Sequence, residues 1–138
     1  YAFEDVAQIL RLSPHYTDYL KGGTLVPVPL HPAKQRERGY NQSERIARFL
    51  GREVGDCRVA RLLRRVKYTE TQTRLNRETR EKNVKNAFAL TAGAVVDPST
   101  DYILVDDVFT TGATLNACAA VLRKAGARQI KVATLGHG

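Results

Sequence analysis

Two adjacent carboxylates, Asp106 and Asp107, lie in the part of this chain that is best suited to chemistry. The apolar run Tyr102–Val105 precedes them, and the loop T-T-G-A-T, residues 110–114, follows. Neighbouring carboxylates can accept hydrogen bonds from two adjacent hydroxyls of a ribose, and they can help to hold Mg²⁺ directly or through its water shell. These residue types in this order predict a site for a sugar phosphate.

The loop after the carboxylates has the composition of a phosphate-binding loop. Thr110, Thr111 and Thr114 supply hydroxyls, and Gly112 permits a positive φ, which lets backbone N–H groups curl around an anion. A helix predicted to begin near Ala113 adds its positive N-terminal end. The alternative is an acidic turn and a helix cap with no ligand. No Walker A loop and no G-x-G-x-x-G after a strand occur, which disfavours nucleotide folds built on those motifs.

The hydropathy pattern predicts a frame in which strands alternate with helices, as in a parallel α/β sheet. An inner strand at Tyr102–Val105 would end at the two carboxylates, on the edge where open α/β sheets bind ligands. Both carboxylates are then expected to face ligand and solvent. The other predicted strands are Thr24–Val28, Val59–Leu63, Phe88–Leu90 and Gln129–Leu135. The predicted helices are Phe3–Leu12, His15–Leu20, one that Asn41 and Glu44 cap and that ends within Gly51–Gly55, and Ala113–Ala125 followed by Gly126.

Composition narrows the class of protein. The 138 residues suffice for one domain, and 22 Lys and Arg against 14 Asp and Glu give a net charge of +8. Such a charge favours anionic partners, either nucleic acid or phosphorylated small molecules. No apolar run is long enough to predict a membrane span. Because the chain begins at Tyr1 and contains no methionine, we expect residues to precede it.

The cysteines and histidines give no pattern of a metal site or a nucleophile. Cys57 and Cys118 are expected to be buried free thiols, which fits a reducing cytoplasm. His15, His31 and His137 are scattered along the chain, so each is expected to be a surface or capping residue.

Three motifs, taken together, point to one family. They are V-P-V-P-L at Val26–Leu30 leading to R-G-Y-N-Q at Arg38–Gln42, T-x-x-Q at Thr69–Gln72 ahead of R-x-x-N-V-x-x-A-F at Arg80–Phe88, and L-V-D-D-V-x-T-T-G-A-T-L at Leu104–Leu115. In this order and spacing the chain resembles the ComF family, type I phosphoribosyltransferase-like proteins named after a factor in bacterial DNA uptake. The resemblance covers about Leu25 to Leu135.

The resemblance implies a fold and a domain organisation. Residues 1–138 would form one α/β domain with a type I phosphoribosyltransferase-like open, mainly parallel sheet, flanking helices and a flexible lid loop. Residues 1–23 would belong to a helical hood segment, and the polar stretch 64–86 would be a loop or hairpin followed by a helix from about Asn76. The zinc ribbon that usually precedes this domain in the family has no cysteines here to support it.

The resemblance also assigns residues to phosphoribosyl pyrophosphate (PRPP). Asp106 and Asp107 would bind the ribose hydroxyls and share Mg²⁺ with the ligand. The cradle for the 5′-phosphate would be Val108, Phe109, Thr110, Thr111, Gly112, Ala113 and Thr114. The candidates for pyrophosphate are Arg36 and Arg38 after the first strand, and Arg74, Arg77, Arg80 and Lys82 in the lid. For each of these cations, a surface ion pair, a dimer contact or a solvated helix face is the alternative.

The implied activity is the Mg²⁺-dependent transfer of a 5-phosphoribosyl group from PRPP to a nitrogenous, nucleobase-like acceptor, with release of pyrophosphate. A cytoplasmic homodimer is expected. One alternative is a non-catalytic PRPP- or nucleotide-binding module that acts in DNA uptake or nucleic-acid handling, and another is a purely structural α/β domain. The sequence leaves the acceptor base open.

Overall fold

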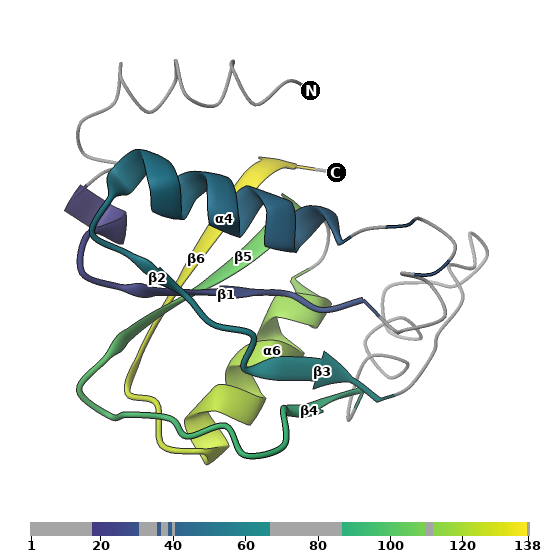
Figure 1. Ribbon diagram of the computed structural model, residues 1–138. Helices are drawn as coiled ribbons and strands as arrows, with labels where there is room; N and C mark the ends of the chain where they lie inside the picture. The colour runs from purple at the N-terminus through teal and green to yellow at the C-terminus, as the bar shows by residue number, and fades with distance from the viewer. Residues whose placement is uncertain are drawn as a thin grey trace.

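A four-stranded parallel sheet forms the centre of the computed structural model (Figure 1). The structure describes residues 18–30, 36, 39, 41–66, 87–109 and 112–137, and for residues 108, 109 and 135–137 only the backbone. The sheet has the order β2-β1-β5-β6. Its strands are β1 (Thr24–Pro27), β2 (Arg58–Val59), β5 (Asp101–Phe109) and β6 (Gln129–His137). All neighbours run parallel, so the predicted α/β class is confirmed.

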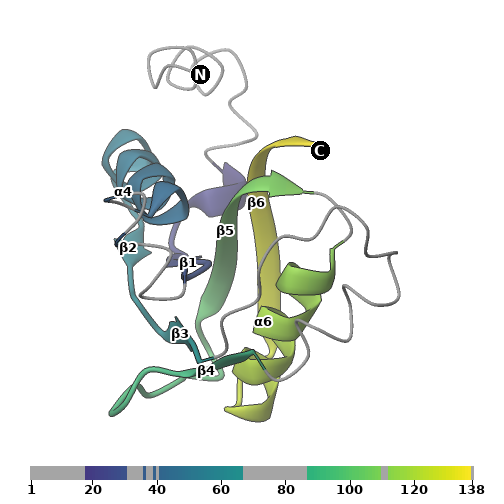
Figure 2. The same cartoon turned by 90° about the vertical axis from the view of Figure 1, so that its right-hand side faces the viewer.

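Helices α4 (Gln42–Val54) and α6 (Ala113–Lys124) cover opposite faces of this sheet (Figure 2). Successive side chains of β5 alternate between the two faces, as they do in any strand. Ile103 and Val105 pack with α4, whereas Tyr102 and Leu104 pack with α6. The residues that α4 contributes are Ile46, Ala47 and Leu50, and those that α6 contributes are Leu115, Cys118, Ala119 and Leu122. Burial on both faces explains why Leu25–Pro27 of β1 and Tyr102–Val105 of β5 are apolar runs.

Asn41 caps the start of α4 as predicted, and a glycine caps its end. The side-chain oxygen of Asn41 accepts hydrogen bonds from the N–H groups of Ser43 (3.0 Å) and Glu44 (3.4 Å). The helix ends at Gly55, which has a φ of 80°, and its N–H donates to the carbonyl of Gly51 at 3.0 Å. Local residue types therefore fix both boundaries of this helix.

Glycines also delimit α6. Gly112 precedes the first turn with a φ of 80°, and Gly126 follows the last turn with a φ of 119°. At the second end, the N–H groups of Gly126 and Ala127 donate to the carbonyls of Arg123 and Leu122, both at 3.0 Å. This pair of bonds is a Schellman motif, which requires a left-handed residue at the position of Gly126.

One predicted strand is wrong. The stretch Val59–Leu63 is divided between β2, which pairs with β1, and β3 (Leu63–Arg65), which belongs to a second sheet with β4 (Phe88–Leu90). β3 and β4 are antiparallel and pack on the α6 side of the core. An apolar run predicts a strand without naming its partner, so the break between the sheets is invisible in the sequence. Phe88–Leu90 itself is confirmed as a strand.

β5 and β6 are longer than predicted. β5 continues through the carboxylates to Phe109, because β6 keeps pairing with it as far as His137. On the other side, the pairing of β1 with β5 ends at Pro27 opposite Val105. The carboxyl-terminal half of β5 therefore has a strand neighbour on one side only, and this opening is where the candidate site lies.

The side chain of Tyr19 bonds to the backbone of β6, an edge strand of the main sheet. Its hydroxyl donates to the carbonyl of Val132 at 3.1 Å and accepts from the N–H of the same residue at 3.2 Å. The ammonium of Lys131 lies 5.0 Å from the centre of the Tyr19 ring and donates to the carbonyl of Tyr19 at 3.1 Å. A single side chain thus satisfies backbone groups that an edge strand would otherwise expose.

The two cysteines are free thiols, as expected. Cys118 is fully buried, whereas Cys57 is half-buried and donates to the carbonyl of Leu20 at 2.9 Å. Within the described residues, every helix is too short or too polar to cross a bilayer.

Candidate functional site

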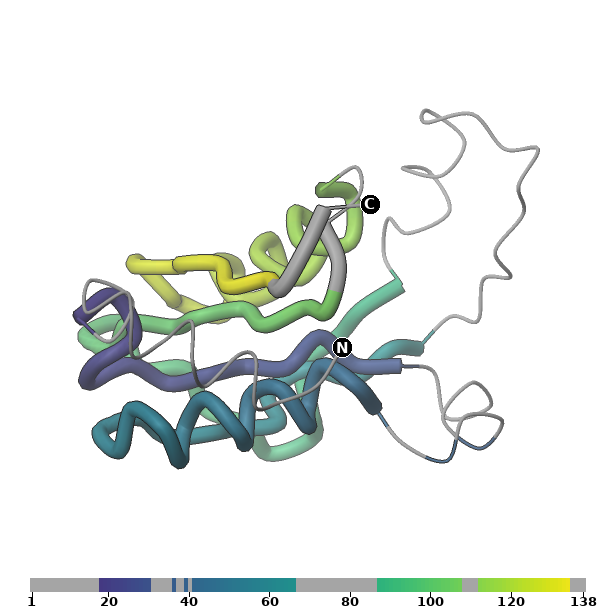
Figure 3. Tube along the Cα trace, turned by 90° about the horizontal axis from the view of Figure 1, so that it is seen from above, coloured from purple at the N-terminus to yellow at the C-terminus, as the bar shows by residue number. Residues whose placement is uncertain are grey.

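Asp106 and Asp107 lie where the pairing between β1 and β5 stops. The N–H of Val28 donates to the carbonyl of Val105 at 2.9 Å, and this is the last backbone bond before the carboxylates. Figure 3 shows the carboxyl ends of β1 and β5 and the start of α4 on the same side of the molecule. Both residues thus lie in the carboxyl-terminal half of a strand of a parallel sheet, where the sequence placed them.

The carboxylate of Asp106 is held by two donors on one oxygen. Its Oδ1 accepts a hydrogen bond from the N–H of Asp107 at 2.9 Å and a long one from the hydroxyl of Ser43 at 3.3 Å. Ser43 is only 5% exposed and is the one buried polar side chain among the described residues. Asp106 is itself half-buried. Asp107 is half-buried as well, so neither carboxylate is fully exposed to solvent.

The surroundings of Asp106 make its ionisation unfavourable. Burial, a hydrogen bond with the Asp107 carboxyl and the charge of Asp107 raise its pKa from 3.8 to about 7. The hydrogen bonds from Ser43 and from the N–H of Asp107 oppose this shift. A buried carboxyl beside a second carboxyl fits a bound cation, which would favour the ionised form of Asp106.

The two carboxylates suit a metal ion that takes most of its ligands from substrate and water. No cluster of three or more His, Cys, Asp or Glu side chains occurs in the described part of the chain. Mg²⁺ is commonly bound by one or two carboxylates together with substrate oxygens and water. Asp106 and Asp107 fit this pattern.

A buried thiol, that of Cys118, lies close enough to Asp106 to be affected by its charge. Cys118 of α6 is fully buried, and burial followed by the charge of Asp106 raises its pKa to about 12. Arg65, from the end of β3, opposes that shift, and its guanidinium lies 5.2 Å from the centre of the Phe88 ring. Cys118 therefore stays protonated at neutral pH and is unsuited to act as a nucleophile.

The candidate phosphate loop joins β5 to α6. Gly112 occupies the N-cap position and has no side chain to accept the N–H groups of the first turn. The first turn contains no acidic residue, and Thr114 within it is half-buried. Val108 and Phe109 are described only as backbone of β5, and Ala113 is the first residue of α6. Thr110 and Thr111 lie outside the described residues.

Of the candidate pyrophosphate residues, only Arg36 lies within the described part of the chain. Arg36 is exposed. The others lie outside the described residues: Arg38, Arg74, Arg77, Arg80 and Lys82. The predicted helix Phe3–Leu12 and the lid residues 69–86 also lie outside them.

Two side chains next to the site were missed by sequence reasoning. Ser43 was detectable, because it precedes the apolar positions Ile46, Ala47 and Leu50 by three, four and seven residues and so shares their buried face. Arg65 gave no such signal, because its neighbour Arg64 looks the same in sequence and only strand pairing distinguishes them.

A polar cavity of about 260 Å³ adjoins the first turn of α4. Three arginines and one glutamate line it with residues of the β1 exit and β3: Pro27, Pro29, Leu30, Asn41, Glu44, Arg61, Leu63, Arg64 and Arg65. The predicted contact between the Glu44 side chain and the Asn41 cap does not form. The Glu44 carboxylate pairs with Arg61 and lies 3.8 Å from Arg48, which draws it away from the helix end. The surplus of cations favours anionic ligands in this cavity.

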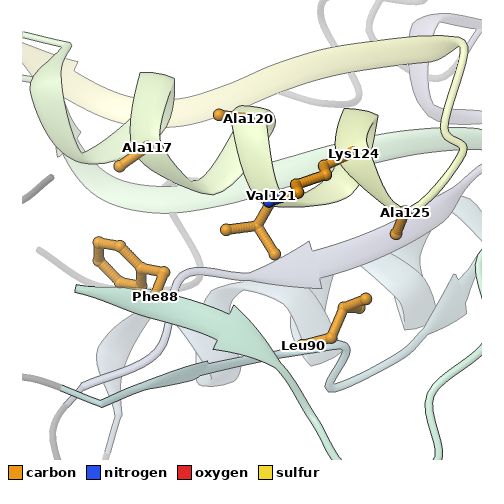
Figure 4. Close-up of a pocket in the computed structure, with 7 residues that line it drawn as sticks. All are labelled: Phe88, Leu90, Ala117, Ala120, Val121, Lys124 and Ala125. Carbon is orange, nitrogen blue, oxygen red and sulfur yellow. The ribbon is translucent and has the colours of Figure 1, made fainter. Parts of the chain in front are cut away.

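A second, apolar groove of about 490 Å³ runs between β4 and α6 (Figure 4). Phe88 and Leu90 face Ala117 and Val121 across it, and Lys124 is its one charged residue. A ligand as highly charged as a sugar phosphate would find little compensation there. The candidate site is therefore the polar edge around Asp106 and not this groove.

Comparison with known proteins agrees with this geometry. A family model described as the phosphoribosyl transferase domain matches residues 39–137. Competence protein F of Haemophilus influenzae is 41% identical over 108 residues, which are 78% of this chain and 47% of that protein. Competence protein ComFC of Streptococcus pneumoniae is 31% identical over 110 residues, 80% of this chain and 46% of that protein. The chain spans slightly less than half the length of these curated relatives.

Solved structures show the same fold at low sequence identity. A hypoxanthine phosphoribosyltransferase from Staphylococcus aureus has a TM-score of 0.60 and 14% identity, covering 97% of this chain and 64% of that one. A purine phosphoribosyltransferase from Pyrococcus horikoshii has a TM-score of 0.55 and 21% identity, covering 96% and 71%. The type I phosphoribosyltransferase-like fold is thus confirmed. The chain belongs to the phosphoribosyl transferase domain family, and its predicted kinship with the ComF proteins is confirmed.

Proposed function

We propose that this domain binds PRPP and transfers its 5-phosphoribosyl group to a nitrogenous acceptor with release of pyrophosphate. One observation carries the proposal. The paired carboxylates Asp106 and Asp107 lie at the open carboxyl half of β5, and the connection from this strand leads directly to the glycine-capped start of α6. This arrangement offers acceptors for ribose hydroxyls and, a few residues further along the chain, donors for a phosphate.

The chain would act mainly by positioning and charge. The Asp106 and Asp107 carboxylates would accept the ribose hydroxyls, and the backbone around Gly112 would donate to the 5′-phosphate. Mg²⁺ held between the carboxylates and the ligand would compensate the charge of the pyrophosphate. The acceptor nitrogen forms a bond to C1 of the ribose as the bond from C1 to the pyrophosphate oxygen breaks, and pyrophosphate leaves with the electron pair. No protein nucleophile is required, which agrees with the protonated state of Cys118.

Calorimetry with PRPP tests the binding step. We expect binding in the presence of Mg²⁺ and much weaker binding in excess chelator. The melting temperature of the ligand-free protein should not change on chelation, because the described residues contain no cluster for a structural metal. A screen of nucleobases with PRPP and Mg²⁺, scored by pyrophosphate release, tests turnover. Absence of PRPP binding under all these conditions would refute the proposal.

A second candidate is a PRPP-binding module that acts in DNA handling without turnover. The names of the relatives, Competence protein F and DNA utilization protein YhgH of Escherichia coli, favour it, as does the net charge of +8. Its signature would be PRPP binding without pyrophosphate release, together with DNA binding that falls steeply as salt increases. DNA binding that is absent at low salt would count against it.

A further inference from the structure

We propose that Asn41 and Ser43 are positioning residues of the PRPP site, which hold the Asp106 carboxylate and the exit of β1 in one fixed arrangement. The inference rests on the proposed function. It gives a role to the start of α4, where Asn41 belongs to the R-G-Y-N-Q motif and Ser43 is the first residue after that motif. Neither residue is placed in contact with the ligand, so both would act through Asp106 and the backbone.

Ser43 fixes the direction of the Asp106 carboxylate. Its hydroxyl and the N–H of Asp107 both donate to the same oxygen, Oδ1, at 3.3 and 2.9 Å. Two donors on one oxygen restrict rotation of the carboxylate, so the second oxygen has a defined direction. Ser43 is itself fixed, because it lies one turn before Ile46 and Ala47, which are 1% and 0% exposed.

Asn41 extends this contact to β1. Its Nδ2 donates to the carbonyl of Val28 at 3.2 Å, while its Oδ1 accepts from the N–H of Ser43 at 3.0 Å. Val28 in turn donates to the carbonyl of Val105, the residue before Asp106, at 2.9 Å. These bonds form a closed circuit from Val105 through Val28, Asn41 and Ser43 to Asp106.

The circuit joins residues on either side of the candidate pyrophosphate loop, Leu30–Tyr40. In the sequence, this loop begins two residues after Val28 and ends directly before Asn41. Holding reacting groups in a fixed relative geometry is a large part of what an enzyme of this class can contribute. A loss of the circuit should therefore reduce ligand binding more than it reduces folding stability.

The alternative is that Asn41 and Ser43 only cap the helix. Asn41→Ser separates the two roles, because serine caps a helix about as well as asparagine but lacks the amide that reaches Val28. Ser43→Ala removes the hydroxyl from Asp106 and leaves the cap in place. Ser99→Ala is the matched control, since its hydroxyl also donates to an aspartate, Asp97, at 2.8 Å, but at the opposite end of β5.

We expect Ser43→Ala and Asn41→Ser each to weaken PRPP binding in Mg²⁺ about threefold to tenfold, as for the loss of one hydrogen bond within a charged site. Melting temperatures should stay within about 2 °C of the parent. Ser99→Ala should bind PRPP like the parent, and Ser43→Thr, which keeps the hydroxyl, should restore most of the affinity. Parent-like affinity in both Ser43→Ala and Asn41→Ser would overturn the inference.

Crystal structures of the ligand-free parent and of Ser43→Ala provide a readout that does not depend on PRPP. We expect the Asp106 carboxylate to rotate or to occupy several orientations in the variant. An unchanged carboxylate would overturn the inference even if the parent bound no PRPP. Failure of the parent to bind PRPP would instead refute the proposed function, so the two failures are distinguishable.

Discussion

The N-terminal ends of α4 and α6 lie at the same edge of the sheet but are built in opposite ways. Asn41 closes α4 with its side chain, and Glu44 adds a negative charge to the first turn. α6 begins at Gly112, which has no side chain, and its first turn holds no acidic residue. The C-terminal turns of both helices carry basic residues, so the charge of the two helices differs only at their N-terminal ends.

This difference shows how the positive end of a helix can serve two purposes. In α4, groups of the chain itself compensate the partial charge, and the gain is stability. In α6, Gly112 supplies no side-chain cap and the first turn holds no acidic residue, which is the arrangement that the proposed phosphate site would use. Asp106 lies between them, held by Ser43 of α4 and close to Cys118 of α6. The comparison predicts that changes at the start of α6 alter binding, whereas the two capping bonds that Asn41 accepts at the start of α4 contribute to stability, separately from the bond of its amide to Val28.

The largest effect is expected from removing both charges between the helices. Asp106→Asn with Asp107→Asn should weaken PRPP binding at least about a hundredfold, or about 3 kcal/mol, because the acceptors for ribose and the anionic partners of Mg²⁺ are lost together. Calorimetry in Mg²⁺ measures it. Asp97→Asn, a change in the turn before β5, is the control and should bind normally. Unaltered affinity in the double variant would remove the carboxylates from the site.

A second effect concerns pH. The pKa of Asp106 is raised by burial and by Asp107, so the folded state holds this proton more tightly than the unfolded chain. The stabilisation is present below pH 4 and is lost as pH rises through about 7. Urea unfolding in chelator should show Asp106→Asn gaining about 2 kcal/mol relative to the parent between pH 5 and pH 8. An equal stability difference at both pH values would contradict the burial of this carboxyl.

Gly112→Ala should have a smaller effect on stability and a selective effect on binding. At a φ of 80° an alanine costs about 1–2 kcal/mol, and the strain falls on the backbone that is proposed to donate to the 5′-phosphate. Gly93→Ala is a matched control, because Gly93 has a φ of 79° and no atom within 4 Å of an added Cβ. Both variants should lose similar stability in urea, but only Gly112→Ala should lose PRPP affinity. If Gly112→Ala and Gly93→Ala bind PRPP with equal affinity, the start of α6 takes no part in ligand binding.

The smallest effect is expected at the α4 cap. Asn41→Ala should lower the free energy of unfolding by about 1 kcal/mol, because two N–H groups lose their acceptor. Asn41→Ser should recover most of that loss. Urea titrations of the three proteins measure the difference. If Asn41→Ala and Asn41→Ser lower the free energy of unfolding equally, the Asn41 side chain does not stabilise α4 by capping it.

Local chemistry was predictable wherever a residue type decides a conformation by itself. Gly112 and Gly126 adopt the predicted positive φ, and Asn41 caps its helix, because these preferences depend on a few neighbouring atoms. The approximate place of Asp106 and Asp107 at a strand's carboxyl end was predictable for a similar reason, since an apolar run followed by charges marks a change from core to edge.

The partners of each element were decided only by the tertiary structure. The apolar stretch Val59–Leu63 had to be split between two sheets, because β2 pairs with β1 for only two residues and β3 then pairs with β4. Asp106 accepts a hydrogen bond from Ser43 at 3.3 Å because α4 approaches it from a distant part of the sequence. Its raised pKa follows from burial and from Asp107. The sequence by itself determined which residues could form a phosphoribosyl site, and only packing between distant elements decided how they are oriented and charged, since burial and pairing depend on neighbours that the local sequence does not contain.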